Sequence, residues 1–162
     1  NFYHSIYTFN PIVAEEAFQN NFSVVNDVSG GQDQRMITTL RKHSAGLILT
    51  HRNKNSSSIH DKVDYKDIVK DVKNDLMKQV ENILELGVNR DQIAIDVGLG
   101  FGKTQEQSAT LFESIGQFVG DYPLVVGYSR KKFTKLLKTS DEELLNHCQN
   151  QGVSLVRLHF ID

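Results

Sequence analysis

Short apolar runs alternate with segments of helical periodicity from one end of this chain to the other. Six runs, most of them rich in β-branched residues and bounded by polar residues or glycine, are predicted to be buried strands: residues 4–9, 23–30, 45–51, 92–98, 122–129 and 154–160. Amphipathic segments predicted to be helices lie between them, at residues 11–19, 33–43, 65–86, 104–120 and 129–137. Connections this short favour parallel strands with the helices packed outside the sheet.

Two α/β architectures fit this alternation, an open doubly wound sheet and a (β/α) barrel. Six units are two fewer than the eight of the usual barrel. In the longest predicted helix we expect Asp64 to cap the start and Gly87 to end it. The polar residues 51–62 are predicted to form a mobile loop.

The composition predicts one globular domain spanning residues 1–162 and excludes several classes of function. A net charge of −2 gives no electrostatic argument for binding nucleic acid. The single cysteine, Cys148, excludes an internal disulfide framework and a multi-cysteine zinc site. No apolar run is long enough for a membrane span, and the first residues do not resemble a signal peptide, so we expect a cytoplasmic protein.

A glycine-rich segment, "IAIDVGLGFGKT", invites comparison with phosphate-binding loops. A nucleotide-hydrolase loop needs a glycine, four residues and then Gly-Lys-Ser/Thr, but the first of these positions is Val97, and the glycine is Gly98. The dinucleotide fingerprint does not match either. Asp96 closes the apolar run before this turn, so its carboxylate is expected to be partly desolvated and to need a hydrogen-bond donor. The alternative is an aspartate that only starts a glycine turn.

Polar residues follow five of the six predicted strands. Taken singly, each has an ordinary structural explanation; His51, for example, fits a satisfied structural histidine. If the strands are parallel, however, their carboxyl ends meet at one pocket. The set suits a flat heterocycle and an anion: Asn26, Asp27, His51, Asp96, Ser129–Lys131, Arg157 and His159.

Four motifs in this order, "SVVNDVSGG", "IDVGLGFGKT", "VVGYSRKKF" and "VSLVRLH", resemble dihydropteroate synthase, the folate-pathway member of the pterin-binding (β/α)8 TIM barrels. The resemblance covers about six βα units, strands 3 to 8 of that barrel. It implies condensation of 4-aminobenzoate with 6-hydroxymethyl-7,8-dihydropterin pyrophosphate, release of pyrophosphate, assistance by magnesium (Mg2+), inhibition by sulfonamides and a homodimer.

The resemblance also assigns roles to individual residues. It implies a catalytic group of Lys131, Arg157 and His159, in which Lys131 contacts the pterin beside the aminobenzoate pocket and the other two bind the leaving pyrophosphate. Gly127 matches the glycine that lets the ring approach the backbone. The other substrate-binding positions are Asn26, Asp96 and Ser129.

The chain departs from the family pattern in two respects. The segments "NVTPDSF", which carries the metal-binding asparagine, and "STRPG" are not in it, and Tyr7 stands where the third family strand has an aspartate. Besides a synthase, two readings therefore remain: a catalytically inactive relative that retains pterin binding or acts through a protein partner, and a methyltransferase acting on a reduced folate, which "SRKKF" disfavours. Six strands of such a barrel are expected to leave two sheet edges exposed.

Overall fold

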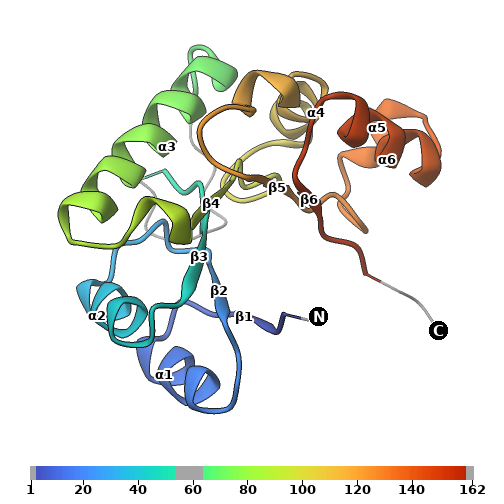
Figure 1. Ribbon diagram of the computed structural model, residues 1–162. Helices are drawn as coiled ribbons and strands as arrows, with labels where there is room; N and C mark the ends of the chain where they lie inside the picture. The colour runs from blue at the N-terminus through green and yellow to red at the C-terminus, as the bar shows by residue number, and fades with distance from the viewer. Residues whose placement is uncertain (1–2, 54–63, 160–162) are drawn as a thin grey trace.

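The computed structural model of the chain describes residues 3–53 and 64–159, where parallel strands alternate with helices (Figure 1). One six-stranded sheet has its strands in sequence order, and every neighbouring pair is parallel. The strands are β1 (Ser5–Tyr7), β2 (Val24–Asp27), β3 (Gly46–Thr50), β4 (Ile93–Asp96), β5 (Leu124–Val126) and β6 (Leu155–Val156).

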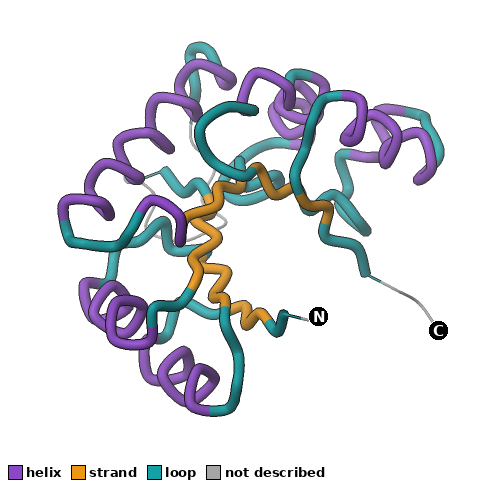
Figure 2. The backbone as a smooth tube through the Cα atoms, in the orientation of Figure 1, coloured by secondary structure: helices purple, strands orange, loops and turns teal. Residues whose placement is uncertain are grey.

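The helices lie on the convex side of the curved sheet, and the concave side opens between β1 and β6 (Figure 2). Short 3-10 helices occur at Arg90–Gln92 and Ile115–Phe118. The α-helices are α1 (Pro11–Gln19), α2 (Gln34–His43), α3 (Ile68–Glu85), α4 (Gln105–Glu113), α5 (Thr134–Leu137) and α6 (Asp141–Asn150). This curled half-barrel confirms the predicted partial (β/α)8 architecture, because a doubly wound sheet would carry helices on both faces.

Local sequence explains most element boundaries, with two corrections. Helix α3 begins at Ile68, because Asp67 rather than Asp64 is its N-cap and accepts a hydrogen bond from the backbone N–H of Lys70 at 3.1 Å. The predicted helix 129–137 is helical only at Thr134–Leu137. Residues 54–62 of the predicted mobile loop lie outside the described residues, so that prediction stays open.

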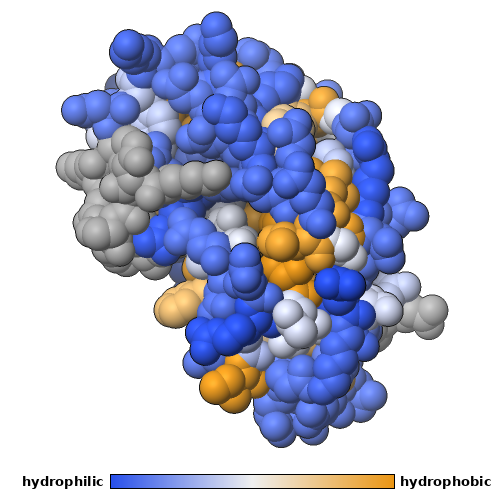
Figure 3. All heavy atoms as spheres, turned by 90° about the vertical axis from the view of Figure 1, so that its left-hand side faces the viewer, coloured by the Kyte–Doolittle hydropathy of each residue, from blue (hydrophilic) through white to orange (hydrophobic). Residues whose placement is uncertain are grey.

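Side-chain alternation along the strands separates the core between sheet and helices from a concave face that carries apolar residues such as Ile48 and Val125 and has polar residues at the strand ends. Val25, Leu47 and Ile95 belong to the same core cluster as the buried residues of α3, Val72, Leu76, Val80 and Ile83. On the side of the molecule formed by α1, α2 and α3, the outward surface is largely hydrophilic, with scattered apolar patches (Figure 3). Within the described part of the chain, no helix has the length and hydropathy of a membrane span.

The sheet ends in two edge strands, as expected for six strands of a barrel. Strand β1 pairs with β2 alone and β6 with β5 alone. Tyr7 on β1 is 48% exposed and Leu155 on β6 is 53% exposed. Exposure in the sheet is therefore concentrated at its two edges.

Candidate functional site

Three polar side chains lie together where β2, β3 and β4 end on the concave face. Thr50 is in register with Asp96, and its hydroxyl group donates a hydrogen bond to Asn26 Oδ1 at 2.9 Å. All three residues are buried, with exposed fractions of 1% for Thr50, 1% for Asp96 and 4% for Asn26. Parallel pairing thus brings these polar groups to one place at the edge of the core.

The Asp96 carboxylate has one satisfied oxygen and one free oxygen. Oδ1 accepts a hydrogen bond from the backbone N–H of Gly98 at 2.8 Å. Oδ2 is buried and has no hydrogen-bond partner among the described residues. A buried carboxylate oxygen without a donor costs free energy, so this atom is the natural acceptor for a ligand N–H group.

Lys131 approaches the same place from the loop after β5. Its Nζ donates a hydrogen bond to the backbone carbonyl of Leu99 at 2.6 Å and lies 5.2 Å from the centre of the Phe101 ring. Burial lowers the pKa of Lys131 to about 8, helped by the positive charge of Arg157 and opposed by the negative charge of Asp96. A ligand anion would favour its charged form.

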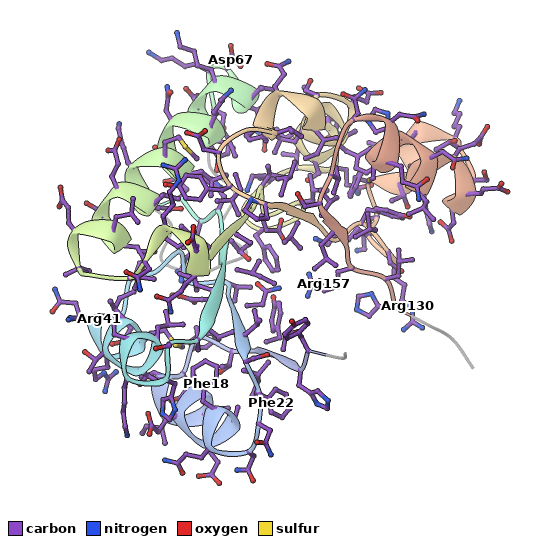
Figure 4. All side chains as sticks on the ribbon, in the orientation of Figure 1. Phe18, Phe22, Arg41, Asp67, Arg130 and Arg157 are labelled. Atoms are coloured by element: carbon purple, nitrogen blue, oxygen red, sulfur yellow. The ribbon has the colours of Figure 1, made fainter. Side chains whose placement is uncertain are left out.

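Arg157 follows β6 and points into the space on the concave side of the sheet (Figure 4). Its backbone N–H donates to the carbonyl of Val126 at 2.8 Å, which continues the β5–β6 ladder. The guanidinium lies against Gly127, where a Cβ would be 2.9 Å from Nη2, so a larger residue at 127 would displace it. Arg157 Nε is buried and has no hydrogen-bond partner among the described residues.

Tyr7 reaches the site from the first strand. The guanidinium carbon of Arg157 lies 5.2 Å from the centre of the Tyr7 ring, within the range of a cation–π contact. Burial raises the pKa of the Tyr7 phenol; the charge of Arg157 opposes this effect, and that of Asp96 adds to it. Tyr7, Asp96 and Arg157 therefore act on one another electrostatically.

The glycine turn after β4 connects this cluster to a buried lysine. Gly98, Gly100 and Gly102 all have positive φ angles, of 67°, 78° and 61°. Lys103 is buried, and its Nζ donates to the carbonyls of Gly98 at 3.0 Å and Phe101 at 3.1 Å. Sequence reasoning considered this lysine only as part of a phosphate loop and did not predict its burial.

Ser129 and His159 lie in a neighbouring part of the structure. The backbone N–H of His159 donates to Ser129 Oγ at 3.3 Å, and the two residues line a cavity of about 280 Å3 together with residues of α6. The cluster around Asp96 contains Asn26, Lys131, Arg157 and Gly127 of the predicted site residues. Ser129 and His159 lie beside this cluster, in the cavity of about 280 Å3.

A second cavity, of about 350 Å3, adjoins Lys131. It is bounded by the glycine turn, the start of α4 and the loop after β5. Phe101 gives it an aromatic wall, and Arg130, Lys131 and Lys132 give it basic groups. An aromatic carboxylate would match both features.

Comparison with known proteins assigns the chain to a family. The profile of the family described as pterin binding enzyme matches residues 3–159. The chain belongs to this family. The chain is 34% identical to a dihydropteroate synthase of Synechocystis over 85% of its own length and 48% of that protein. It is 30% identical to the Bacillus subtilis enzyme over 96% of its length and 55% of that protein.

Solved structures agree with the family assignment. Dihydropteroate synthase from Thermus thermophilus superimposes with a TM-score of 0.82 at 31% identity, over 96% of this chain and 64% of the other. The enzyme from Clostridium difficile, determined in the presence of pteroic acid, also gives a TM-score of 0.82, at 28% identity over 98% of this chain and 62% of the other. The chain spans about half the length of the curated relatives it matches.

Proposed function

We propose that this chain supplies the pterin-binding part of a dihydropteroate synthase, in the condensation of 4-aminobenzoate with 6-hydroxymethyl-7,8-dihydropterin pyrophosphate. The observation that carries the proposal is the free, buried Oδ2 of Asp96 beside two cationic side chains. Membership of the pterin-binding family supports it.

The arrangement suits a heterocycle with donors on one edge. Asp96 Oδ2 would accept an N–H of the pterin ring, which replaces the hydrogen bond that this buried oxygen lacks. Asn26 accepts a hydrogen bond from Thr50, which is in register with Asp96, and it adds an amide to the same surface. Because the three residues are held by adjacent strands, the site is largely formed before the ligand binds.

Charge on the leaving group would be received by Arg157 and Lys131. The guanidinium offers several N–H donors in a planar fork, which suits phosphate oxygens. Holding the substrate and stabilising pyrophosphate are the main tasks in this reaction, since little covalent work falls to the protein. His159 would join this anion site only from its neighbouring cavity.

The 350 Å3 cavity is the proposed place for 4-aminobenzoate. Phe101 and the alkyl part of Lys131 would contact the ring, and the basic groups would face its carboxylate. Lys131 belongs to both the cavity and the Asp96 cluster, so it would lie between the two substrates.

Magnesium does not fit the residues that the structure describes. Within them, no group of three His, Cys, Asp or Glu side chains could hold a metal ion. Asp96 offers one free oxygen and has cationic neighbours, whereas Mg2+ prefers several oxygen ligands in an octahedral arrangement. We therefore derive no step through a metal from this chain.

A catalytically inactive relative that retains pterin binding is the second candidate, and Tyr7 favours it. A phenol lacks the paired acceptors of a carboxylate, and here its ring lies against Arg157, the group proposed to bind the leaving anion. Pterin binding without turnover would select this candidate.

Asp96→Asn tests pterin binding, which both candidates assume. The amide can keep its oxygen toward Gly98, but it presents N–H donors where the free carboxylate oxygen was. We expect 6-hydroxymethylpterin to bind about 100-fold more weakly, equivalent to about 3 kcal/mol, measured by titration calorimetry.

Asp121→Asn is the matched control, since Asp121 is exposed and pairs with Arg90. Equal pterin affinity in Asp96→Asn and the unaltered protein would refute the proposed site. Release of pyrophosphate with both substrates and magnesium then separates a synthase from an inactive relative.

A further inference from the structure

Lys103 is a buried cation that the proposed reaction does not use. It is 7% exposed, and its three polar contacts saturate the three donors of an ammonium group. Two are the carbonyls of Gly98 and Phe101, and the third is His51 Nδ1 at 3.0 Å. A charge in such a place costs free energy unless all its donors are paired.

The contact with Lys103 determines the tautomer of His51. An ammonium group only donates, so His51 Nδ1 must accept, and the proton of the neutral imidazole is on Nε2. Nε2 lies 3.7 Å from Asp75 Oδ2, which is too long for a hydrogen bond but close enough for electrostatic attraction. Burial and the charge of Lys103 lower the pKa of His51 to about 4, so the ring is neutral near pH 7.

Two lysines hold the same glycine turn from different sides. Lys103 holds the carbonyls of Gly98 and Phe101, and Lys131 holds the carbonyl of Leu99 between them. The N–H of Gly98 in turn donates to Asp96 Oδ1. The conformation of this turn therefore fixes the rotation of the Asp96 carboxylate and the direction of its free oxygen.

We propose that Lys103 is a positioning residue for the pterin pocket: with His51 it holds the turn Gly98–Gly102 so that Asp96 and Lys131 face the ligand. The proposal rests on the proposed function, because it concerns the same pocket. Lys103 acts on Asp96 through the turn, and it also lines the 350 Å3 cavity. Asp96, the residue it positions, is bound to the turn through the N–H of Gly98.

Four charged or titratable groups face Lys103 from the elements around it. They are His51 after β3, Asp75 on α3, Asp96 on β4 and Lys131 after β5. Burial, against the opposing negative charges of Asp96 and Asp75 and with the help of the positive charge of Lys131, lowers the pKa of Lys103 to about 7. Near neutral pH the ammonium form thus exchanges with an amine that has one donor fewer.

The test compares Lys103→Met, which removes the donors at similar volume, with Lys103→Arg, which keeps a cation. The matched control is Lys78→Met on the exposed face of α3. We expect Lys103→Met to bind 6-hydroxymethylpterin at least 10-fold more weakly, Lys103→Arg to recover part of this loss, and Lys78→Met to bind normally. Amide hydrogen exchange should accelerate at residues 98–102 in Lys103→Met and not elsewhere.

The proposal would be overturned if Lys103→Met left both the pterin affinity and the rate of amide exchange at the turn unchanged. Equal acceleration of exchange across the whole core would overturn it too, since that result indicates a general structural role. Exchange needs no ligand. If the unaltered protein binds no pterin, the proposed function fails, and the role of Lys103 in the turn is still decided.

A measurement on the unaltered protein covers the case in which the variants do not fold. In 15N NMR spectra between pH 5.5 and 9, His51 should be neutral, and below pH 7, where Lys103 is an ammonium group, its proton should be on Nε2. The amide resonances of residues 98–102 should shift with an inflection near pH 7, where Lys103 titrates. A proton on Nδ1 below pH 7, or turn resonances that do not respond to pH, would contradict the proposal.

Discussion

Tyr7 brings an aromatic ring into a cluster of otherwise charged and amide side chains. Its ring is the contact that Arg157 makes across the open side of the sheet, and its hydroxyl lies within the electrostatic influence of Asp96. The side chain would compete with an anionic ligand for Arg157, if Arg157 binds one as proposed. We therefore expect Tyr7 to influence the affinity of the Arg157 guanidinium for an anion.

Replacing Tyr7 tests this competition. In Tyr7→Asp the ring is lost, and a carboxylate supplies paired acceptors on the same strand, so pterin affinity should rise about 10-fold, or about 1.4 kcal/mol. Tyr7→Phe is the matched control, because it keeps the ring over which Arg157 lies. Calorimetric titration that gives the same pterin affinity for Tyr7→Asp and the unaltered protein would show that Tyr7 is not part of the site.

Parallel strand order brings Asn26 and Asp96 together, because β2 and β4 end at the same edge of the sheet. Arg157 directly follows β6, whereas Lys131 lies in the loop after β5, where strand order does not decide its position. The roles of these residues toward a ligand stay predictions. His159 differs because β6 ends at Val156, and the period-two alternation no longer applies three residues later. Lys103 was missed because its burial depends on His51, which is 52 positions away in the sequence.

At the scale of elements, the β4–α4 turn is the connection most dependent on glycine. Gly98 has a φ of 67°, and a Cβ there would lie 2.5 Å from the backbone oxygen of His51. Neither atom can move without disturbing β3 or β4, since His51 N–H also donates to the carbonyl of Asp96 at 2.7 Å. The turn is therefore fixed by backbone contacts as well as by the lysines.

Gly98→Ala should consequently affect both stability and binding. The strained φ and the backbone clash should lower the free energy of unfolding by about 1–3 kcal/mol, measured by urea denaturation. Pterin affinity should fall with it, since the N–H of Gly98 orients Asp96.

Gly120→Ala is the matched control, because a Cβ there would meet no heavy atom of the described residues within 4 Å. A Gly98→Ala protein as stable as the control would show that the turn can relax. In that case the glycine would not be required by the backbone.

Element boundaries show what local sequence can decide. Helix α1 starts at Pro11 as predicted, and α2 follows Asp33, because their capping signals stand alone. For α3 the sequence offers both Asp64 and Asp67, and the second is selected because Asp71 accepts hydrogen bonds from the N–H groups of Lys66 and Asp67. The hydrophobic periodicity of the sequence predicts the helix, but it does not decide which of the two aspartates is its N-cap.

For the whole molecule, the two buried lysines predict how stability depends on pH. The pKa values of Lys103, about 7, and Lys131, about 8, both lie below the 10.5 of an exposed lysine. Between those values the unfolded chain binds more protons than the folded one, so the free energy of unfolding rises with pH. Each lysine adds at most about 1.4 kcal/mol per pH unit.

Urea denaturation at pH 7, 8 and 9 checks this prediction. The free energy of unfolding should increase over the series, and Lys103→Met should increase less, since it lacks one of the two groups. The tyrosines with raised pKa values act above pH 10, outside this range. Cys148, whose pKa burial raises to about 11, opposes the increase as the pH approaches 9, but a single thiol opposes it by less than the two lysines add. A free energy of unfolding that stays level or falls from pH 7 to 9 would contradict the burial of these charges.

The contact between Arg157 and Tyr7 also gives the molecule an optical reporter. The chain contains five tyrosines and no tryptophan, so its near-ultraviolet absorbance comes chiefly from phenol groups. One of these phenols lies against the guanidinium that we expect an anion to attract. Pyrophosphate, which does not absorb in this region, should therefore produce a tyrosine difference spectrum on binding, and Tyr7→Phe should abolish that signal.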